Sequence, residues 1–434
     1  MCFTMPSGAT TRNLGVDSWR VSLAMRILFV APQIPWPPDI GLRQRMYALL
    51  RAIARRHRVT LTAPARDGHE ERIAGLGDLI ERFLPAPDRT YPRDTLEEGR
   101  RWKRLVRYAR DLTTTATPYT CRVCSPEWSA LIAAKRDEFD AVVCRNRYVA
   151  VLDGLPRCRI VVDADDLNYM FLWRQARSFT RGWERYLLFA ESLRSYLYEQ
   201  RLFSRVARTL LCSEEDVARI HSPHTTLVRN GIDLVPASRL RPPEGARTIV
   251  FVGTFGYEPN SDGLRWFIRE VWPLLQRRIP DVRLRVVGKS ATAQQLPFAE
   301  VGGVDLIGGV RDVAEWICGA VLSVVPLRFG AGTRIKILES LGLGRLVVST
   351  TIGAEGYADI TEEHGLIRRD TPQEFAQAVA ECLANPERTL SLGAAGRRLV
   401  EANYTWEKTT APLVSDLDGG LRSSRRRPRL GSAT

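Results

Sequence analysis

Short apolar runs alternate with amphipathic segments along most of the chain, and the first such pair begins near residue 25. Arg26–Val30 predicts a buried strand, and Leu42–Arg56 has apolar residues at helical spacing. Arg58–Thr62 predicts the next strand. This order opens a doubly wound α/β domain, in which ligands bind beyond the carboxyl ends of the strands. The proline-rich loop Pro32–Gly41 is therefore expected to face a cleft, although it would also serve as a simple connector.

The pattern continues through the first half of the chain and then restarts. Further strands are expected at Asp140–Cys144, Arg159–Asp163, Thr209–Cys212 and Thr226–Arg229, and Phe171–Arg208 is expected to be mostly helical. The polar, proline-rich segment Arg239–Ala246 predicts a domain boundary. Beyond it, Thr248–Val252 predicts a strand that leads into a glycine-containing loop and a helix capped by Ser261.

Length agrees with this organisation, because 434 residues favour two or three domains over one core. We expect α/β domains at residues 25–240 and 241–405, preceded by a disordered extension at residues 1–24. A C-terminal helix or crossover is expected at residues 406–420, followed by a basic, flexible tail at 421–434.

One stretch of the second half, Val321–Gly356, combines a strand, a glycine-rich turn, a helix and another strand. The apolar run Val321–Val325 predicts the first strand. Gly330 and Gly332 would let the backbone turn tightly and approach a ligand. A helix is expected from about Thr333 to about Leu343.

The first turn of that helix contains Arg334 and Lys336, although a helix N-terminus favours negative charge. Cations placed where backbone N–H groups already attract anions indicate a binding site for an anion such as phosphate. Glu339 follows Lys336 by three residues, on about the same helix face. An ordinary surface ion pair between Lys336 and Glu339 is the alternative interpretation.

Charge and composition are typical of a globular protein with an anionic partner. Hydrophobic residues at 44% and charged residues at 26% are typical of a globular protein, and no apolar run approaches the length of about 20 residues that spans a bilayer. The net charge of +14 indicates an anionic partner. The eight cysteines are scattered, which favours a reducing compartment, and the isolated pair Cys121 and Cys124 is a weak signal for zinc or redox chemistry.

The segment Arg100–Leu112 predicts a basic amphipathic helix, with an apolar stripe surrounded by arginines and a lysine. Such a helix suits the surface of an anionic membrane. Alternatively, the stripe packs on the core and the arginines face solvent. No nucleic-acid-binding motif accompanies it, so a nucleic-acid partner is not expected.

Asp163 and Asp165 form an Asp-x-Asp pattern after a predicted strand. This short pattern also occurs in metal-dependent sugar transferases that have a single nucleotide-binding domain. We expect instead that Asp163, Asp165 and Asp166 are cleft-facing carboxylates that bind no metal, on the acceptor side and far from the glycine-rich turn. A helix N-cap formed by Asp165 or Asp166 is the alternative.

Several strings together resemble the retaining glycosyltransferases of family 4, and most closely the subgroup that makes bacterial exopolysaccharides. These strings are VRNGID at Val228–Asp233, FVGTFGYEPNSDGLRWF at Phe251–Phe267, PLRFGAGTRIKILESLGLGRLVVST at Pro326–Thr350 and IGAEGY at Ile352–Tyr357. The proline-rich loop that ends at Gly41 fits as well. The resemblance covers about residues 25–406 and is most specific in the Pro326–Thr350 string.

The resemblance implies the α/β GT-B fold, in which two Rossmann-like domains face each other across a cleft. It also implies a nucleoside diphosphate sugar as donor and co-substrate, with no metal or other cofactor. The acceptor would be a glycan or a lipid-linked sugar in exopolysaccharide biosynthesis. A cytoplasmic protein is expected, and Arg100–Leu112 would allow peripheral attachment to the inner face of the plasma membrane.

The resemblance assigns roles to individual residues. Arg334 and Lys336 would lie near the diphosphate, Glu339 would bind the ribose, and Gly41 would let the first domain approach the diphosphate. Arg45 joins the three aspartates on the acceptor side. The expected donor-binding residues are Gly253, Thr254, Gly330, Ala331, Gly332, Thr333 and Glu339.

The sequence departs from the family pattern in two places. The family often has two glutamates with seven residues between them, and the first position is Ala331 here. The loop Thr254–Asn260 lacks the basic pair of many members, so Arg334 and Lys336, with Arg328 as a further candidate, would supply the phosphate-binding charge. A nucleotide-sugar epimerase of the same fold and an inactive scaffold in a polysaccharide assembly complex are the alternative functions.

Overall fold

The computed structural model describes residues 24–66, 68–87, 118, 125–152, 154–178, 182–245, 247–289, 301–419 and 421. The predicted basic helix Arg100–Leu112, the pair Cys121 and Cys124, nearly all of the N-terminal extension and the basic tail lie outside the described residues. Among the described residues, no helix is long and apolar enough to cross a membrane.

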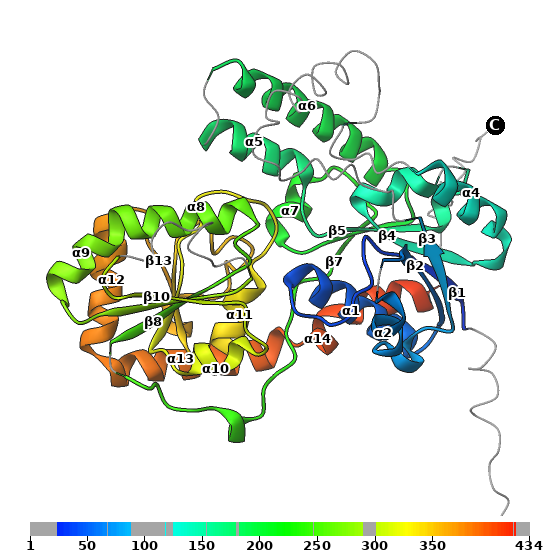
Figure 1. Ribbon diagram of the computed structural model, residues 1–434. Coiled ribbons are helices and arrows are strands. Elements are labelled where there is room, and N and C mark those ends of the chain that lie inside the picture. The colour runs from blue at the N-terminus through cyan, green and yellow to red at the C-terminus, as the bar shows by residue number, and fades with distance from the viewer. Residues whose placement is uncertain are drawn as a thin grey trace, which may run out of the picture.

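The first domain is built on a seven-stranded parallel sheet with the order β3-β2-β1-β4-β5-β6-β7 (Figure 1). Its strands are β1 (Arg26–Val30), β2 (Arg58–Pro64), β3 (Arg82–Ala86), β4 (Ala141–Arg145), β5 (Ile160–Ala164), β6 (Arg208–Leu211) and β7 (Thr225–Leu227). Its helices are α1 (Gly41–Ala54), α2 (His69–Ala74), α4 (Pro126–Ala134), α5 (Asn168–Ser178), α6 (Glu184–Phe203) and α7 (Glu214–Arg219). The central strands are buried on both faces, which explains their continuous apolar sequences.

The second domain repeats this plan with a six-stranded parallel sheet of order β10-β9-β8-β11-β12-β13. Its strands are β8 (Thr248–Val252), β9 (Arg283–Val287), β10 (Val304–Gly308), β11 (Leu322–Val325), β12 (Leu346–Ser349) and β13 (Leu366–Arg368). Its helices are α8 (Glu258–Trp266), α9 (Trp272–Arg278), α10 (Val313–Cys318), α11 (Ile335–Gly342), α12 (Pro372–Ala384) and α13 (Pro386–Asn403). The expectation of two doubly wound α/β domains that face each other is confirmed.

One local prediction in this domain is wrong. Ser261 does not cap α8, because the helix already begins at Glu258 and Ser261 lies inside it. Its hydroxyl donates instead to the carbonyl of Phe255. Ser213 and Asp312, by contrast, do cap α7 and α10 with their side chains.

The chain passes between the domains twice, and the two passages lie side by side. Ile232 on the way out donates its N–H to the carbonyl of Tyr404 at 2.9 Å, and Trp406 on the way back donates to the carbonyl of Ile232 at 3.2 Å. A side chain at Gly231 would meet the backbone of Tyr404 and Trp406 at 2.9 Å, so only glycine fits there. These contacts form a two-stranded hinge.

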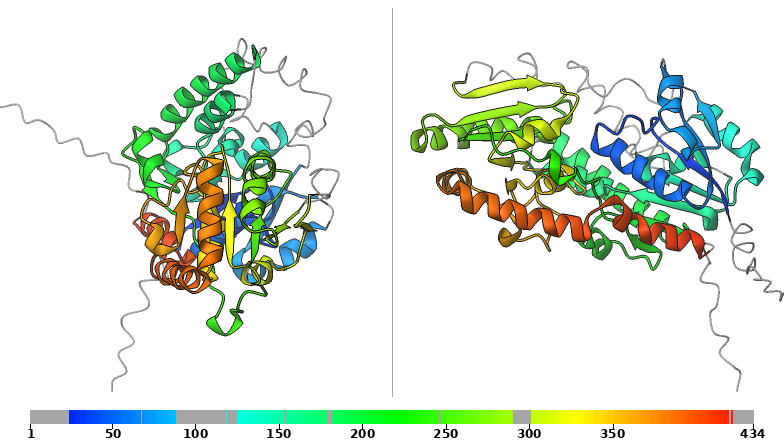
Figure 2. Two further views of the ribbon diagram at one scale, coloured as in Figure 1. Left: turned by 90° about the vertical axis from the view of Figure 1, so that its left-hand side faces the viewer. Right: turned by 90° about the horizontal axis from the view of Figure 1, so that it is seen from below.

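The last helix of the described residues, α14 (Trp406–Asp418), returns to the first domain and completes its core. Leu413 and Leu417 are buried in the same apolar cluster as Leu49 and Ile53 of α1. In Figure 2, right, α13 and α14 run almost end to end beneath both domains.

Candidate active site

A cavity of about 1140 Å³ lies between the two domains, beyond the carboxyl ends of strands from both sheets. It is large enough for a nucleotide-sized ligand with space to spare. The loop Pro32–Gly41 contributes to its wall, as expected. Its charged lining residues are Asp39, Arg145, Arg147, Asp163, Asp165, Asp166, Asp233, Lys289, Arg311, Asp312, Arg334, Lys336 and Glu339.

The glycine-rich turn after β11 forms the floor of this cavity beside the N-terminus of α11. Gly330 has φ +124 and Gly332 has φ +72, conformations that other residues rarely adopt. A side chain at Gly332 would also collide with the carboxylate of Asp166. Ala331 is buried, and Thr333 accepts a hydrogen bond at 2.8 Å from Asn230 of the first domain. The turn is therefore packed directly against the first domain.

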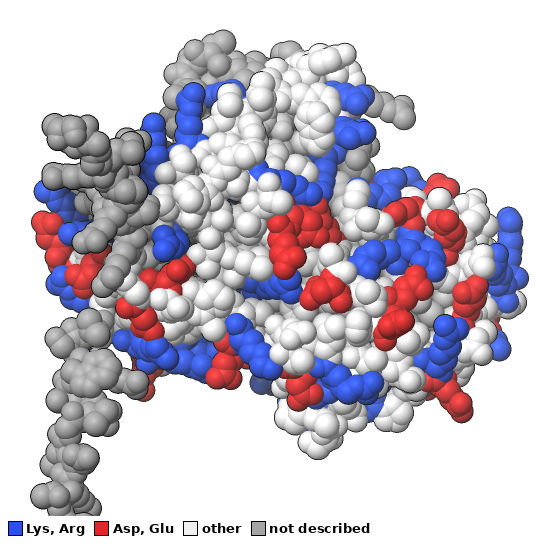
Figure 3. Space-filling view, turned by 180° about the vertical axis from the view of Figure 1, so that it is seen from behind, with Lys and Arg blue, Asp and Glu red and all other residues white. Residues whose placement is uncertain are grey.

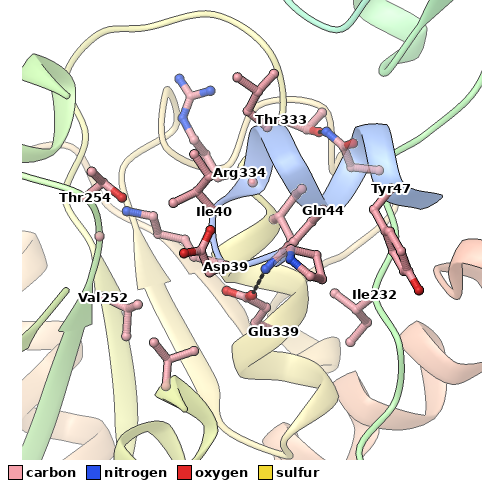
Figure 4. Close-up of a pocket in the computed structure, with 18 of the residues that line it drawn as sticks. Asp39, Ile40, Gln44, Tyr47, Ile232, Val252, Thr254, Thr333, Arg334 and Glu339 are labelled. Carbon is pink, nitrogen blue, oxygen red and sulfur yellow. Dashed lines mark hydrogen bonds between the residues drawn. The ribbon is translucent and has the colours of Figure 1, made fainter. Parts of the chain in front are cut away.

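Arg334 is the residue that precedes the first turn of α11, and its side chain is 8% exposed. Its Nη1 donates to the carbonyls of Ala331 and Gly332 at 2.5 and 2.6 Å, so the guanidinium points toward the turn and away from Glu339 (Figure 4). Its Nε and Nη2 are buried without a hydrogen-bond partner among the described residues. Buried donors that lack acceptors are costly, which marks this position as prepared for an anion.

Lys336 follows Arg334 by two residues, with its ammonium 2.7 Å from Oδ1 of Asn260 and over the ring of Phe251. A Cβ atom at Gly253 would lie 3.1 Å from Nζ of Lys336, so the glycine leaves room for the lysine side chain. Burial lowers the pKa of Lys336 to about 7, and repulsion from Arg334 adds to this shift.

Glu339 faces the same cavity and accepts a hydrogen bond at 2.9 Å from Nε2 of Gln44, which reaches across from α1 (Figure 4). Burial raises the pKa of Glu339, and the hydrogen bond from Gln44 opposes that shift. Glu339 also acts at a distance to oppose the fall in the pKa of Lys336, but no ion pair within 4.0 Å joins Lys336 to a carboxylate of the described residues. The alternative of a surface ion pair between Lys336 and Glu339 is therefore wrong.

The remaining expected donor-side residues also line the cavity. Gly253 and Thr254 follow β8, and the carbonyl of Thr254 accepts from the Asn260 side chain at 2.9 Å. Gly41 begins α1, with Ile335 of the second domain 3.6 Å from the place where a side chain would start. Arg328 does not line the cavity, since its guanidinium forms a two-pronged ion pair with Asp262.

The expected acceptor-side residues form a buried network with two arginines. Arg45 is fully buried and binds Asp163 through Nε and Nη2 at 2.9 and 2.8 Å, and it lies 3.7 Å from Asp165. Arg145 lies 3.3 Å from Asp165 and 3.9 Å from Asp166. Arg45 and Arg145 outweigh burial and lower the pKa of Asp165, whereas burial and the neighbouring Asp165 raise the pKa of Asp166 to about 6.

The position of this network corrects one expectation. We expected the aspartates to lie far from the glycine-rich turn, but Asp166 packs directly against Gly332. Neither Asp165 nor Asp166 is seen to cap α5, because the first N–H of that helix, at Asn168, donates to Glu199 at 3.1 Å. Among the described residues, no group of three or more His, Cys, Asp or Glu side chains is placed to hold a metal ion.

Several residues that shape the cavity were not identified from the sequence. Each of them contacts a partner on another element, and no sequence pattern of local spacing identifies such polar residues. They are Gln44, Arg145, Asn230 and Asn260. Arg174 of α5 likewise donates to the carbonyl of Gly330 at 2.6 Å.

Comparison with known proteins gives a family match in the second domain. Residues 246–385 match the family described as "Glycosyl transferases group 1". An uncharacterized 44.6 kDa protein in the cps region of Klebsiella pneumoniae is 24% identical over 176 residues, 39% of this chain and 45% of that protein. A D-inositol 3-phosphate glycosyltransferase of Thermobispora bispora is 27% identical over 243 residues, 48% of this chain and 54% of that enzyme. The chain thus spans about half the length of the curated relatives it matches.

Solved structures show the same fold over nearly the whole chain. A sucrose-phosphate synthase from Thermosynechococcus elongatus has a TM-score of 0.63 at 15% identity and covers 91% of this chain and 98% of its own. HepE of Anabaena, in complex with UDP-glucose, has a TM-score of 0.59 at 13% identity and covers 91% and 100%. This likeness confirms the expected GT-B arrangement of two domains.

Proposed function

We propose that the protein is a glycosyltransferase that moves a sugar from a nucleoside diphosphate sugar to an acceptor. The observation that supports this most directly is the pair of cations at the start of α11. Arg334 has two buried nitrogens without a hydrogen-bond partner among the described residues, and Lys336 bonds there to the neutral side chain of Asn260. Two basic side chains that form no ion pair with a described residue, beside a glycine-rich turn and a helix N-terminus, suit a diphosphate.

The other groups of the donor side match the remaining parts of such a ligand. Glu339 already accepts a hydrogen bond from Gln44, so its carboxylate can accept one from a ribose hydroxyl that displaces this side chain. Backbone N–H groups of Gly330–Thr333 would hold the phosphates and the donor sugar. The match of residues 246–385 to glycosyl transferases of group 1 and the UDP-glucose complex of HepE support this placement.

The chemistry requires stabilisation of the leaving diphosphate. As the bond between the sugar C1 and the diphosphate oxygen breaks, negative charge grows on the phosphates beside Arg334 and Lys336. We propose attack by the acceptor hydroxyl on the same face, with its proton passing to a donor phosphate oxygen, so that the anomeric configuration is retained. Neither a metal ion nor another cofactor is part of this proposal.

We place the acceptor beside Asp166 and Arg145, because these side chains reach the same cavity from the first domain. A glycan or lipid-linked sugar acceptor in polysaccharide biosynthesis is supported by the relative from a cps region. Of Asp163, Asp165 and Asp166, the last has the most exposed side chain, at 40%.

The first experiment is a screen of UDP- and GDP-sugars for thermal stabilisation, because a ligand that binds the native state raises the melting temperature. Release of nucleoside diphosphate is then measured with and without candidate acceptors. A transferase releases it only when acceptor is present, an epimerase of the same fold needs none, and an inactive scaffold binds no donor. NMR of the product anomeric carbon tests retention.

Lys336→Ala should lower turnover by about 100-fold or more, as loss of one electrostatic contact to the leaving group does. Lys289→Ala is the matched control, because Lys289 also lines the cavity but is already paired with Asp39 at 2.5 Å. Equal effects of the two substitutions would remove Lys336 from its proposed role.

A further inference from the structure

The α5–α6 hairpin stands out from the body of the protein above the junction of the two domains (Figure 1; Figure 2, left). It collects nearly all of the exposed large apolar side chains of the described residues. These are Trp173 (45% exposed), Trp183 (50%), Tyr186 (73%), Leu193 (60%) and Leu197 (46%), and only Tyr257 lies elsewhere. A patch of this kind marks an interaction surface.

The middle of helix α6 is inverted relative to an ordinary amphipathic helix. Between the buried Leu188 and Leu202, its buried positions are Glu191, Ser192, Ser195 and Glu199, and Glu199 accepts a hydrogen bond from Asn168 at 2.8 Å. Its exposed positions Tyr186, Leu193 and Leu197 follow at intervals of seven and four residues, so they form one stripe along the outer face. Polar residues inside and apolar residues outside are expected when the outer face is covered by something apolar.

The fully exposed charges around the stripe are all positive. Every exposed residue of the described hairpin, 168–177 and 182–203, is a large apolar residue, an arginine or a glycine. The exposed arginines are Arg177, Arg185 and Arg201, whereas Glu191 and Glu199 are buried and Glu184 is partly buried. Seen from behind, the upper part of the molecule is white with blue at its borders (Figure 3).

We propose that the α5–α6 hairpin is a docking surface for an anionic lipid membrane, with the outer face of α6 lying in the headgroup region. Tryptophan and tyrosine favour that region, leucine extends into the acyl boundary, and arginine binds anionic headgroups. A second copy of the chain fits this surface less well, because a symmetric contact would bring its arginines together. The proposal does not depend on the donor or on the reaction.

The hairpin is also joined to the cavity. Helix α5 begins two residues after Asp166, and its Arg174 binds both the Gly330 carbonyl and Glu355 of the second domain, at 2.6 and 2.5 Å. Docking through the hairpin would therefore hold the mouth of the cavity close to the membrane, where a lipid-linked substrate would be found.

The test uses the full chain and vesicles of phosphatidylcholine with or without phosphatidylglycerol, with sedimentation as the measure of binding. We expect binding to the anionic vesicles and a fall of about 10-fold or more in the partition coefficient for the triple variant Tyr186→Ser, Leu193→Ser, Leu197→Ser. These side chains are exposed, so the melting temperature should be unchanged, and this is measured in parallel.

A pair of charge variants separates this surface from the general positive charge of the chain. Arg185→Gln with Arg201→Gln should weaken binding, whereas Arg277→Gln with Arg278→Gln, on exposed positions of α9, should not. Equal loss in both pairs, or vesicle binding unaffected by the triple variant, would overturn the proposal. The proposal would also be overturned if the wild-type chain self-associates in analytical ultracentrifugation and the triple variant does not. The stripe would then be a protein interface.

Discussion

Lys336 gives the donor site a pH dependence that follows from its surroundings. Burial and the charge of Arg334 lower its pKa to about 7, so in the empty site the protonated fraction falls from about 0.9 at a pH of about 6 to about 0.1 at a pH of about 8. A diphosphate needs the ammonium form. Binding above neutral pH must therefore draw a proton from solution, while binding below the pKa does not.

The size of the effect follows from these fractions. Across this interval the dissociation constant of a nucleoside diphosphate sugar should rise by about 10-fold, which corresponds to about 1.4 kcal/mol of binding free energy. A nucleotide sugar is the right probe because both of its phosphates are esterified and bind no proton near neutral pH. A free nucleoside diphosphate would add the titration of its own terminal phosphate.

The assay is titration calorimetry in two buffers that differ in ionisation enthalpy. At a pH of about 8 the wild-type protein should take up about 0.9 proton per donor bound. Lys336→Arg is the control, because a guanidinium stays charged throughout this range and should bind donor with little of this proton uptake. It also retains Asp166 and Glu339, whose raised pKa values could contribute to any pH dependence. Equal proton uptake in both proteins would refute the assignment to Lys336.

Three further substitutions test other parts of the site. Gly332→Ala should lower turnover by about 100-fold, since the new side chain meets the carboxylate of Asp166 in the first domain. Gly344→Ala is the control, because Gly344 has a similar φ of +71 and open space around it. This control measures the cost of backbone strain alone, about 1–3 kcal/mol in thermal unfolding. Arg45→Met leaves Asp163 buried beside an apolar side chain and should lower the free energy of unfolding by about 3–5 kcal/mol in urea titrations, with recovery when Asp163→Asn is added. Glu339→Gln removes a charged acceptor and should weaken donor binding by about 1.5–3 kcal/mol in calorimetry, and unchanged binding would contradict the ribose contact.

Most of the strands that the sequence identified are buried on both faces of a sheet, and the partly buried edge strand β7 was identified as well. Residues 26–30, 248–252 and 321–325 are continuous apolar runs because helices cover both faces of the sheet. Two edge strands were not identified, β3 at Arg82–Ala86 and β13 at Leu366–Arg368. Both are short and contain charged residues, and β3 contains Pro85, which is tolerated at an edge but weakens the strand pattern.

The site was predictable where its residues are close together in the sequence. Ala331, Arg334, Lys336 and Glu339 lie within nine residues on one turn and one helix, so local spacing places them on the same cavity wall. The contact between Asp166 and Gly332 depends on how the two domains close, and no local pattern records that.

The final helix affects the order in which the protein can be completed during synthesis. Leu413 and Leu417 belong to the core of the first domain but are translated after the whole second domain. A nascent chain that has reached the hinge at Ile232 still exposes the apolar surface of α1 that α14 later covers. That surface stays exposed until α14 has been translated, and a product truncated before α14 exposes it permanently. The first domain therefore cannot complete its core before the second domain has been synthesised.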